Sequence, residues 1–287
     1  MGMWLPQDVA VRESPGVQAL PPVLWVPWRL SGPPPGKTSG MRHYAVELPV
    51  PGTDHGGTVA VYGHWGRPLL VFPTEGGHAR EFADNGMVAA VQDLIDAGRV
   101  KLYCVDSFDA ATWSAHHLPI EERARRHAGY ESWILDVVVP HIRHDTGDCT
   151  DIATAGCSLG AFHALNLAFR RADLFPSALC LSGNYDPGTW RAWGERGDAV
   201  YFHSPVDYVA GLHGDHLDWL RSRLSLSLVC GQGRWEDTTG ALESTWRMAG
   251  LLAAKGIRHE FDLWGHDSPH DWPSWRAQLA KHLPRHC

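Results

Sequence analysis

The stretch Ile152-Ala-Thr-Ala-Gly-Cys-Ser-Leu-Gly-Ala-Phe-His-Ala-Leu165 decides the fold of this chain. It opens with a short apolar run, typical of a strand buried in a sheet, and closes with helix-forming residues. Between them, Gly156-Cys157-Ser158-Leu159-Gly160 matches the pattern G-x-S-x-G, in which two glycines allow a sharp strand-to-helix turn that raises the central serine above the sheet. We therefore predict a strand, a turn that exposes Ser158, and a helix, with Cys157 packed in the core.

The same alternation of strand and helix extends along most of the chain. Short apolar runs of strand length lie at residues 69–72, 102–105, 152–155, 178–181, 226–230 and 261–264. Segments with apolar residues at helical spacing lie between them, at residues 82–97, 120–142, 161–169 and 241–255. Two alternating segments, 44–48 and 58–62, precede these and predict an antiparallel entry to the sheet. The pattern predicts the α/β class, with a mostly parallel sheet covered by helices on both faces.

Two segments depart from this rhythm. Residues 1–40 are rich in proline and glycine, which predicts an irregular N-terminal segment ahead of one domain at residues 41–287. Residues 183–223 are long for a connection and rich in aromatic residues, so we expect a cap insertion over the site. The alternative is a set of extra helices that only extend the core.

Composition excludes several classes of protein. The 287 residues carry a net charge of -7, so no basic face is available for nucleic acid. The first twenty residues contain no continuous apolar stretch, which argues against a signal peptide or a membrane anchor. Six cysteines without C-x-x-C spacing indicate reduced thiols. We therefore expect a cytoplasmic protein without membrane or nucleic-acid partners, and the sequence allows either a monomer or a homo-oligomer.

A serine hydroxyl is a weak nucleophile, so a reactive Ser158 needs a base, a carboxylate and hydrogen-bond donors for an oxyanion. Beyond a serine turn of this kind, the acid and then the histidine follow on loops after later strands. The last apolar run leads into a loop that holds His266 and His270. His270 lies just before a helix predicted near Pro273, whereas His266 could brace the loop.

The same loop also has the composition of a metal site. His266, Asp267, His270 and Asp271 cluster there, and the two histidines, four residues apart, would share a helix face if the segment were helical. Pro269 and Pro273 indicate a loop instead, and no third ligand is evident elsewhere. We therefore expect no metal and no organic cofactor.

The carboxylate and the oxyanion donors follow from the order of the strands. Glu236 and Asp237 both follow the run at 226–230, and the residues leave both open. We favour Glu236, because Asp237 could cap the helix that follows. The loop after residues 69–72 contains Gly76, whose backbone N–H we expect in the oxyanion hole together with that of Leu159.

In these segments the chain resembles the esterase family of α/β hydrolases that includes polyhydroxyalkanoate-depolymerase-like esterases and the mycolyltransferases. The similar segments are Phe72-Pro-Thr-Glu-Gly-Gly77, Gly156-Cys-Ser-Leu-Gly-Ala-Phe-His-Ala164, Leu181-Ser-Gly-Asn-Tyr-Asp186 and His270-Asp-Trp-Pro-Ser-Trp275. The resemblance implies the α/β-hydrolase fold, Ser158 as nucleophile, His270 rather than His266 as base, and a carboxylate from the loop at 235–237. Glu75 is a departure, since similar sequences often have a small residue there.

These observations together predict a serine-dependent carboxylic ester hydrolase that acts on a small or medium ester through an acyl-enzyme. An acyltransferase with the same triad is an alternative, because transfer to water and transfer to an alcohol share this intermediate. A second alternative is a non-catalytic binding protein that keeps the α/β-hydrolase fold. The sequence does not determine the acyl and alcohol groups of the substrate.

Overall fold

The computed structural model describes residues 42–287, so the predicted N-terminal segment 1–40 lies outside the described residues. The described part contains an eight-stranded sheet with the strand order β1-β2-β4-β3-β5-β6-β7-β8. β1 and β2 pair antiparallel, β2 pairs antiparallel with β4, and the remaining neighbours are parallel. The strands are β1 His43–Pro49, β2 Gly56–Tyr62, β3 Arg67–Phe72, β4 Val100–Val105, β5 Ala153–Cys157, β6 Ser177–Leu181, β7 Ser225–Cys230 and β8 His259–Leu263. The expected mostly parallel sheet with an antiparallel entry is confirmed.

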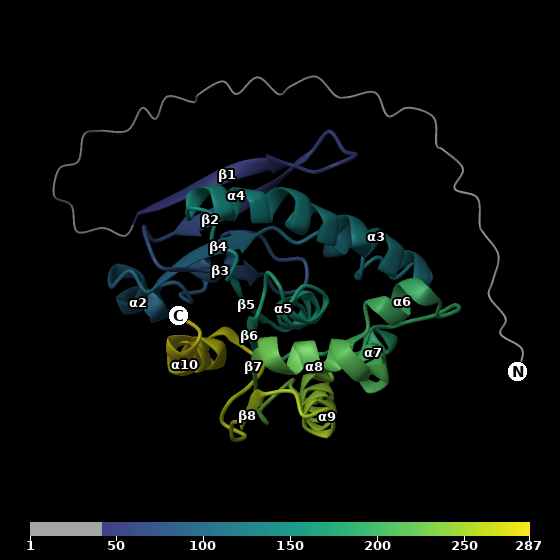
Figure 1. Cartoon of the computed structure of the whole chain (residues 1–287). Helices are drawn as coiled ribbons and strands as arrows, with labels where there is room; N and C mark the ends of the chain where they lie inside the picture. Colours follow the sequence, from purple (N-terminus) through teal and green to yellow (C-terminus); the bar gives the residue numbers. More distant parts are fainter. Residues whose placement is uncertain (1–41) are drawn as a thin grey trace, which may run out of the picture. The chain divides into compact units, whose positions relative to one another are not determined.

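Helices cover both faces of this sheet (Figure 1). The α-helices are α1 Glu81–Asp84, α2 Gln92–Asp96, α3 Ile120–Trp133, α4 Val139–Asp145, α5 Leu159–Arg170, α6 Asp198–Phe202, α7 Pro205–Gly211, α8 Gly214–Arg223, α9 Ala241–Ala254 and α10 Trp272–His282. Shorter 3-10 turns are η1 Ala89–Val91, η2 Asp109–Ala111, η4 Pro187–Thr189 and η5 Leu283–Arg285, and η3 Ile134–Val138 is π-helical.

Alternate residues of the strands supply two separate apolar cores. In β2, Val59 and Val61 face the core formed with α3, α4, α5 and α9, while Ala60 and Tyr62 face the core formed with α1, α2 and α10. Figure 1 shows α2 and α10 on one side of the strands and α5 and α8 on the other. The period of two along β2 thus buries residues on both faces of the sheet, although the alternating segment 58–62 indicated a half-buried strand.

Two of the predicted helices differ from expectation. The segment 82–97 is not one helix, because Gly86 has a positive φ of 73° that interrupts it between α1 and η1. The segment 120–142 is continuous but passes from α3 through the π-helical η3 into α4, with Pro140 at the start of α4. Apolar spacing detects the buried face in both cases but does not detect a change of helix type.

The segment 183–223 combines the two roles that the sequence left open. Its first part, Asn184 to Arg191, lines a pocket beside Ser158. Its later part folds into α6, α7 and α8, whose Val200, Val209 and Leu220 belong to the core on the α5 side of the sheet. The start of the insertion therefore lies at the pocket and the remainder extends the core.

None of the helices within residues 42–287 is both long enough and apolar enough to cross a membrane.

Candidate active site

Ser158 lies in a strained turn between β5 and α5. Its backbone has φ 55° and ψ -120°, outside the regions that most residues adopt. Glycine is required on both sides, because a Cβ on Gly156 would lie 2.2 Å from the carbonyl carbon of Gly160, and a Cβ on Gly160 would lie 2.4 Å from the carbonyl oxygen of Phe72. The two glycines thus let the turn close tightly against the end of β3.

Three side chains from separate loops form a hydrogen-bonded chain at this turn. The Ser158 hydroxyl lies 3.0 Å from Nε2 of His270, and Nδ1 of His270 lies 2.9 Å from Oε2 of Glu236. The Nδ1–H donates to the carboxylate, which leaves the lone pair of Nε2 to accept the serine proton. The structure therefore brings together the serine, the histidine and the favoured one of the two carboxylates.

Glu236 is fully buried and hydrogen-bonded on both oxygens. Its Oε1 accepts from the Ser182 hydroxyl at 2.6 Å and from the Gly231 N–H at 3.2 Å. The Trp275 indole N–H in turn donates to the Ser182 hydroxyl at 3.0 Å, and the Trp275 ring packs edge-on against His270 with centroids 4.9 Å apart. These contacts fix the carboxylate and the imidazole together.

Ser182 and Trp275 were not among the site residues predicted from the sequence. Both lie in segments that resemble the esterase family, which was the available signal. Ser182 also has a positive φ of 51° at the end of β6, and such strain in a residue other than glycine is common at functional sites. Backbone strain of this kind cannot be recognised in a sequence.

The neighbouring residues of the two loops have other roles. The Asp237 side chain is exposed and lines the pocket. Gly240 precedes α9, and no side chain caps this helix, so the suggested capping by Asp237 is not present. His266 donates from Nδ1 to the Gln232 carbonyl at 2.9 Å, which braces the loop. Asp271 caps α10 by accepting from the Ser274 N–H at 3.0 Å. Three of the four residues of the suggested metal site, His266, His270 and Asp271, therefore have separate partners.

Cys157, next to the nucleophile candidate, is fully buried. Burial raises the pKa of its thiol well above the ordinary value, so the thiol stays protonated. This agrees with the predicted packing of Cys157 in the core.

The turn after β3 presents a different backbone donor from the expected one. The N–H of Gly76 donates to Oδ2 of Asp109 at 3.2 Å, so it is not free to bind an oxyanion. The N–H of Thr74 donates to Oε2 of Glu81 at 2.8 Å. Across the described residues, the N–H of Glu75 has no hydrogen-bond partner. Leu159 is the first residue of α5, where backbone N–H groups lack partners within the helix.

A pocket of about 540 Å³ opens beside Ser158, and its lining is polar and apolar in about equal parts. Its volume is in the range of small-molecule sites. The side chains of Glu75, Asp237 and Glu243 give it three carboxylates, and Arg191 gives it one guanidinium. The other residues that line it are Trp113, Ser114, His116, Leu159, Asn184, Thr189, Trp190, Thr238, Thr239 and Gly240.

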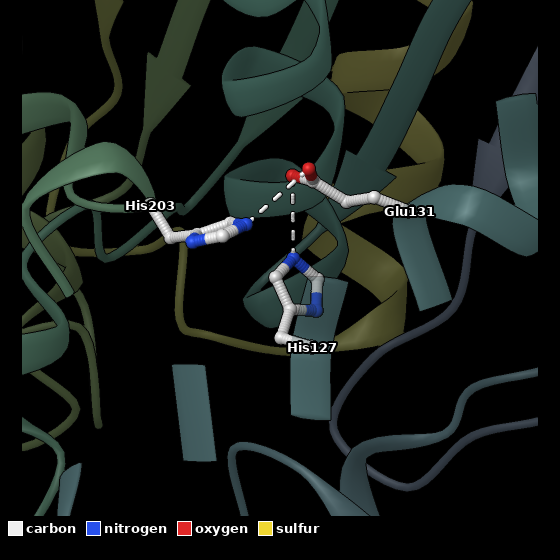
Figure 2. A group of neighbouring side chains, drawn as sticks. All are labelled: His127, Glu131 and His203. Carbon is white, nitrogen blue, oxygen red and sulfur yellow. Dashed lines mark ion pairs between the residues drawn. The ribbon is translucent and has the colours of Figure 1, made fainter. Parts of the chain in front are cut away.

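A buried polar cluster packs against Trp113, one of the residues that line this pocket. His127 and Glu131 of α3 and His203, which follows α6, point their side chains toward one another (Figure 2). One ligand-type atom from each lies within 4.8 Å of the other two, so these three residues have the donor types of a metal site. Arg170 already pairs with the Glu131 carboxylate at 3.1 Å and thus balances its charge. The contacts join α3 to the end of α6.

Comparisons with known proteins identify the family and the fold of this chain. The model of the family described as "Putative esterase" matches residues 38–286. Solved structures with a similar fold include a ferulic acid esterase (19% identity, TM-score 0.67, 86% of this chain and 98% of that one). They also include an S-formylglutathione hydrolase from Agrobacterium tumefaciens (14% identity, TM-score 0.67, 88% and 96%) and MPT51 (FbpC1) from Mycobacterium tuberculosis (14% identity, TM-score 0.65, 85% and 97%).

No protein with curated annotation matches the chain. The solved structures are too distant in sequence to show more than the fold, which is that of the α/β hydrolases. The family match extends over nearly all of the described residues and over each loop that carries a member of the Ser158–His270–Glu236 chain. The chain belongs to the esterase family of α/β hydrolases.

Proposed function

We propose that this protein is a serine-dependent carboxylic ester hydrolase, with Ser158 as nucleophile, His270 as general base and Glu236 as the carboxylate that orients the histidine. The observation that carries the proposal is the continuous hydrogen-bonded chain from Ser158 through His270 to Glu236. It has the polarity that nucleophilic catalysis by serine requires, since Nε2 accepts the serine proton and Nδ1 donates to the carboxylate.

In the first step the Ser158 oxygen attacks the ester carbonyl while its proton moves to Nε2 of His270. The imidazolium that forms is stabilised by the Glu236 carboxylate 2.9 Å from Nδ1. The tetrahedral intermediate then collapses, the alcohol leaves with the proton from Nε2, and an acyl-enzyme remains on Ser158.

For the oxyanion we propose the N–H groups of Leu159 and Glu75, with Glu75 in place of the Gly76 suggested by the sequence. The Gly76 N–H is engaged by Asp109, whereas the Glu75 N–H is unpaired, and both Glu75 and Leu159 line the pocket next to Ser158. Two preorganised donors of this kind stabilise the charge that develops on the carbonyl oxygen.

The second step returns the enzyme to its resting state. Water attacks the acyl carbonyl and gives its proton to His270. The bond between the acyl group and the Ser158 oxygen then breaks, His270 returns the proton to that oxygen, and the acid is released. We propose hydrolysis ahead of acyl transfer because the pocket is open and contains four charged side chains, which favours entry of water. The volume of the pocket and its charged side chains suit a small or medium ester with polar groups better than a long acyl chain.

For the cellular location we propose the cytoplasm. All six cysteines are free thiols, and four of them are buried in the core. This use of cysteine is typical of a reducing compartment.

The experiment that tests the proposal is a hydrolysis screen with p-nitrophenyl esters of increasing acyl length, run on the wild type and on Ser158→Ala. We expect turnover of the short esters by the wild type, declining as the acyl chain lengthens, and loss of turnover in the variant. If the folded wild type hydrolyses none of these esters, or if Ser158→Ala hydrolyses them equally well, the proposal is wrong.

A further inference from the structure

A buried carboxylate that plays no part in the proposed triad lies between the two halves of the oxyanion hole. Asp109, at the start of η2, is 1% exposed. Its Oδ2 accepts from the Gly76 N–H at 3.2 Å and from the Ser107 hydroxyl at 2.5 Å, and its Oδ1 lies 3.3 Å from Nε2 of His163. Gly76 follows Glu75 in the turn after β3, and His163 lies on α5 one helical turn after Leu159.

In the turn after β3, hydrogen bonds engage the groups on both sides of the Thr74–Glu75 peptide and leave the Glu75 N–H without a partner. On one side the Thr74 N–H and hydroxyl both donate to the Glu81 carboxylate, at 2.8 and 2.7 Å. On the other side the Gly76 N–H donates to Asp109. The Thr74 carbonyl, which belongs to the same peptide group as the Glu75 N–H, accepts from the Gly77 N–H at 2.9 Å.

This pattern fixes the direction of the Glu75 N–H. The N–H and C=O of a trans peptide point in opposite directions, so holding the Thr74 carbonyl toward Gly77 turns the Glu75 N–H away from Gly77. The flanking bonds from Glu81 and Asp109 restrain the peptide groups before and after it. The Glu75 N–H, which has no partner in this turn, is therefore held in its orientation by the hydrogen bonds of the groups around it.

Asp109 is suited to this task by its ionisation. Burial alone would raise the pKa of its carboxyl, but hydrogen bonds from His163, Ser107 and Gly76 outweigh burial and lower the pKa below its ordinary value. The group is thus an anion near neutral pH, and its two oxygens accept from all three donors at once. In an asparagine the amide NH2 in the place of Oδ1 can only donate, so it cannot accept from His163 and the bridge to α5 is lost.

We propose that Asp109 is a positioning residue that sets the distance and angle between the Glu75 and Leu159 N–H groups by bridging the turn after β3 to α5. This inference rests on the proposed hydrolase function. Asp109 has no role in binding the ground-state substrate, because it lies outside the pocket lining. Its removal therefore weakens only the interactions that develop as the carbonyl oxygen becomes negative.

The test compares Asp109→Asn with the wild type in kcat, in KM and in inhibition by a trifluoromethyl ketone, which forms a tetrahedral oxyanion on the serine. Removing an entire oxyanion donor costs about 100- to 1000-fold in kcat, so a misplaced donor should cost about 10- to 100-fold. We expect kcat and ketone affinity to fall by the same factor, with KM changed less than about threefold.

Asp145→Asn is the matched control. Asp145 also accepts from three donors, Lys101, Tyr103 and Tyr44, but Lys101 lies at the beginning of β4, the end of the strand away from the site. We expect this variant to lose thermal stability without a change in kcat. If Asp109→Asn behaves in the same way, with kcat and ketone affinity unchanged, Asp109 is only structural and the inference is wrong.

Ser107→Ala covers the case in which Asp109→Asn does not fold. It removes one hydrogen bond to Asp109 but keeps the charge. We expect a smaller fall of about 3- to 10-fold in kcat, again matched in ketone affinity. Unchanged values in a folded Ser107→Ala would overturn the inference. A wild type that neither hydrolyses esters nor binds the ketone would instead overturn the proposed function.

Discussion

Replacement of Glu236 by glutamine exchanges one carboxylate oxygen for an NH2 group, and this should stop His270 from acting as the general base. In the structure Oε1 accepts from Ser182 and Gly231, and a glutamine oxygen can keep both contacts. The amide nitrogen then takes the place of Oε2, 2.9 Å from Nδ1 of His270, where it can only donate. Nδ1 must therefore accept, the proton of the neutral imidazole moves to Nε2, and Nε2 faces Ser158 as a donor.

A histidine held in that tautomer cannot take the serine proton. In serine hydrolases this loss lowers kcat by about 10,000-fold, which corresponds to about 5 kcal/mol in the activation barrier. Stability should fall less, by about 1–3 kcal/mol, because one buried hydrogen bond loses its best geometry. The loss of catalysis is measured as kcat under saturating ester, and the loss of stability is measured as the free energy of unfolding in urea.

Asp237→Asn is the internal control, because its side chain is exposed at the pocket and none of its described hydrogen bonds involves the carboxylate. We expect its kcat to stay within about threefold of the wild type. If Glu236→Gln is folded and keeps more than about a tenth of the wild-type kcat, the tautomer argument is refuted. An inactive Asp237→Asn beside an active Glu236→Gln would assign the role to the neighbouring residue.

Three further outcomes follow from the same contacts. His270→Ala should lower kcat by about a million-fold, whereas His266→Ala, which loses only a loop contact, should cost less than about tenfold; comparable losses in ester hydrolysis would contradict the assignment. Gly160→Ala should lower the free energy of unfolding in urea by about 1–3 kcal/mol, because the new Cβ would meet the Phe72 carbonyl. Gly129→Ala, on α3, places its Cβ in open space and should not lower it. Equal unfolding curves for the two variants would refute the packing argument. Burial lowers the pKa of His286 from 6.5 to about 4, so the folded state resists protonation of this residue. The free energy of unfolding should therefore be highest above about pH 6.5 and decline as the pH falls toward 4. His286→Gln should flatten that decline in urea titrations, and an unchanged decline in the variant would contradict this assignment.

Much of the fold could be predicted because its signals are local. Every apolar run from 69–72 to 261–264 corresponds to an observed strand, because most strands of a parallel sheet carry apolar residues on both faces. The turn at Ser158 was also predictable, since glycine is the residue type that fits the close approach on either side. The interruption of the helix at 82–97 by Gly86 was not predicted, because a glycine within a helical pattern can either continue the helix or end it.

The site was predictable as far as the order of its loops and no further. Strand order places Ser158, His270 and the 236–237 loop at one edge of the sheet, but the direction of each side chain depends on contacts between distant segments. Glu236 points inward because Ser182, 54 residues away in sequence, donates to it. The expected donor Gly76 is engaged by Asp109, 33 residues away, and no local pattern around Gly76 indicates that contact.

The central claim is that Ser158 is an activated nucleophile, and covalent labelling by a fluorophosphonate tests it most directly. The measurement is intact-protein mass followed by peptide mapping, on the folded wild type and on Ser158→Ala. The account predicts one adduct per chain, located on the peptide that contains Ser158, and no adduct on the variant. A wild type that stays unlabelled, or a variant that is labelled to the same extent, would contradict it.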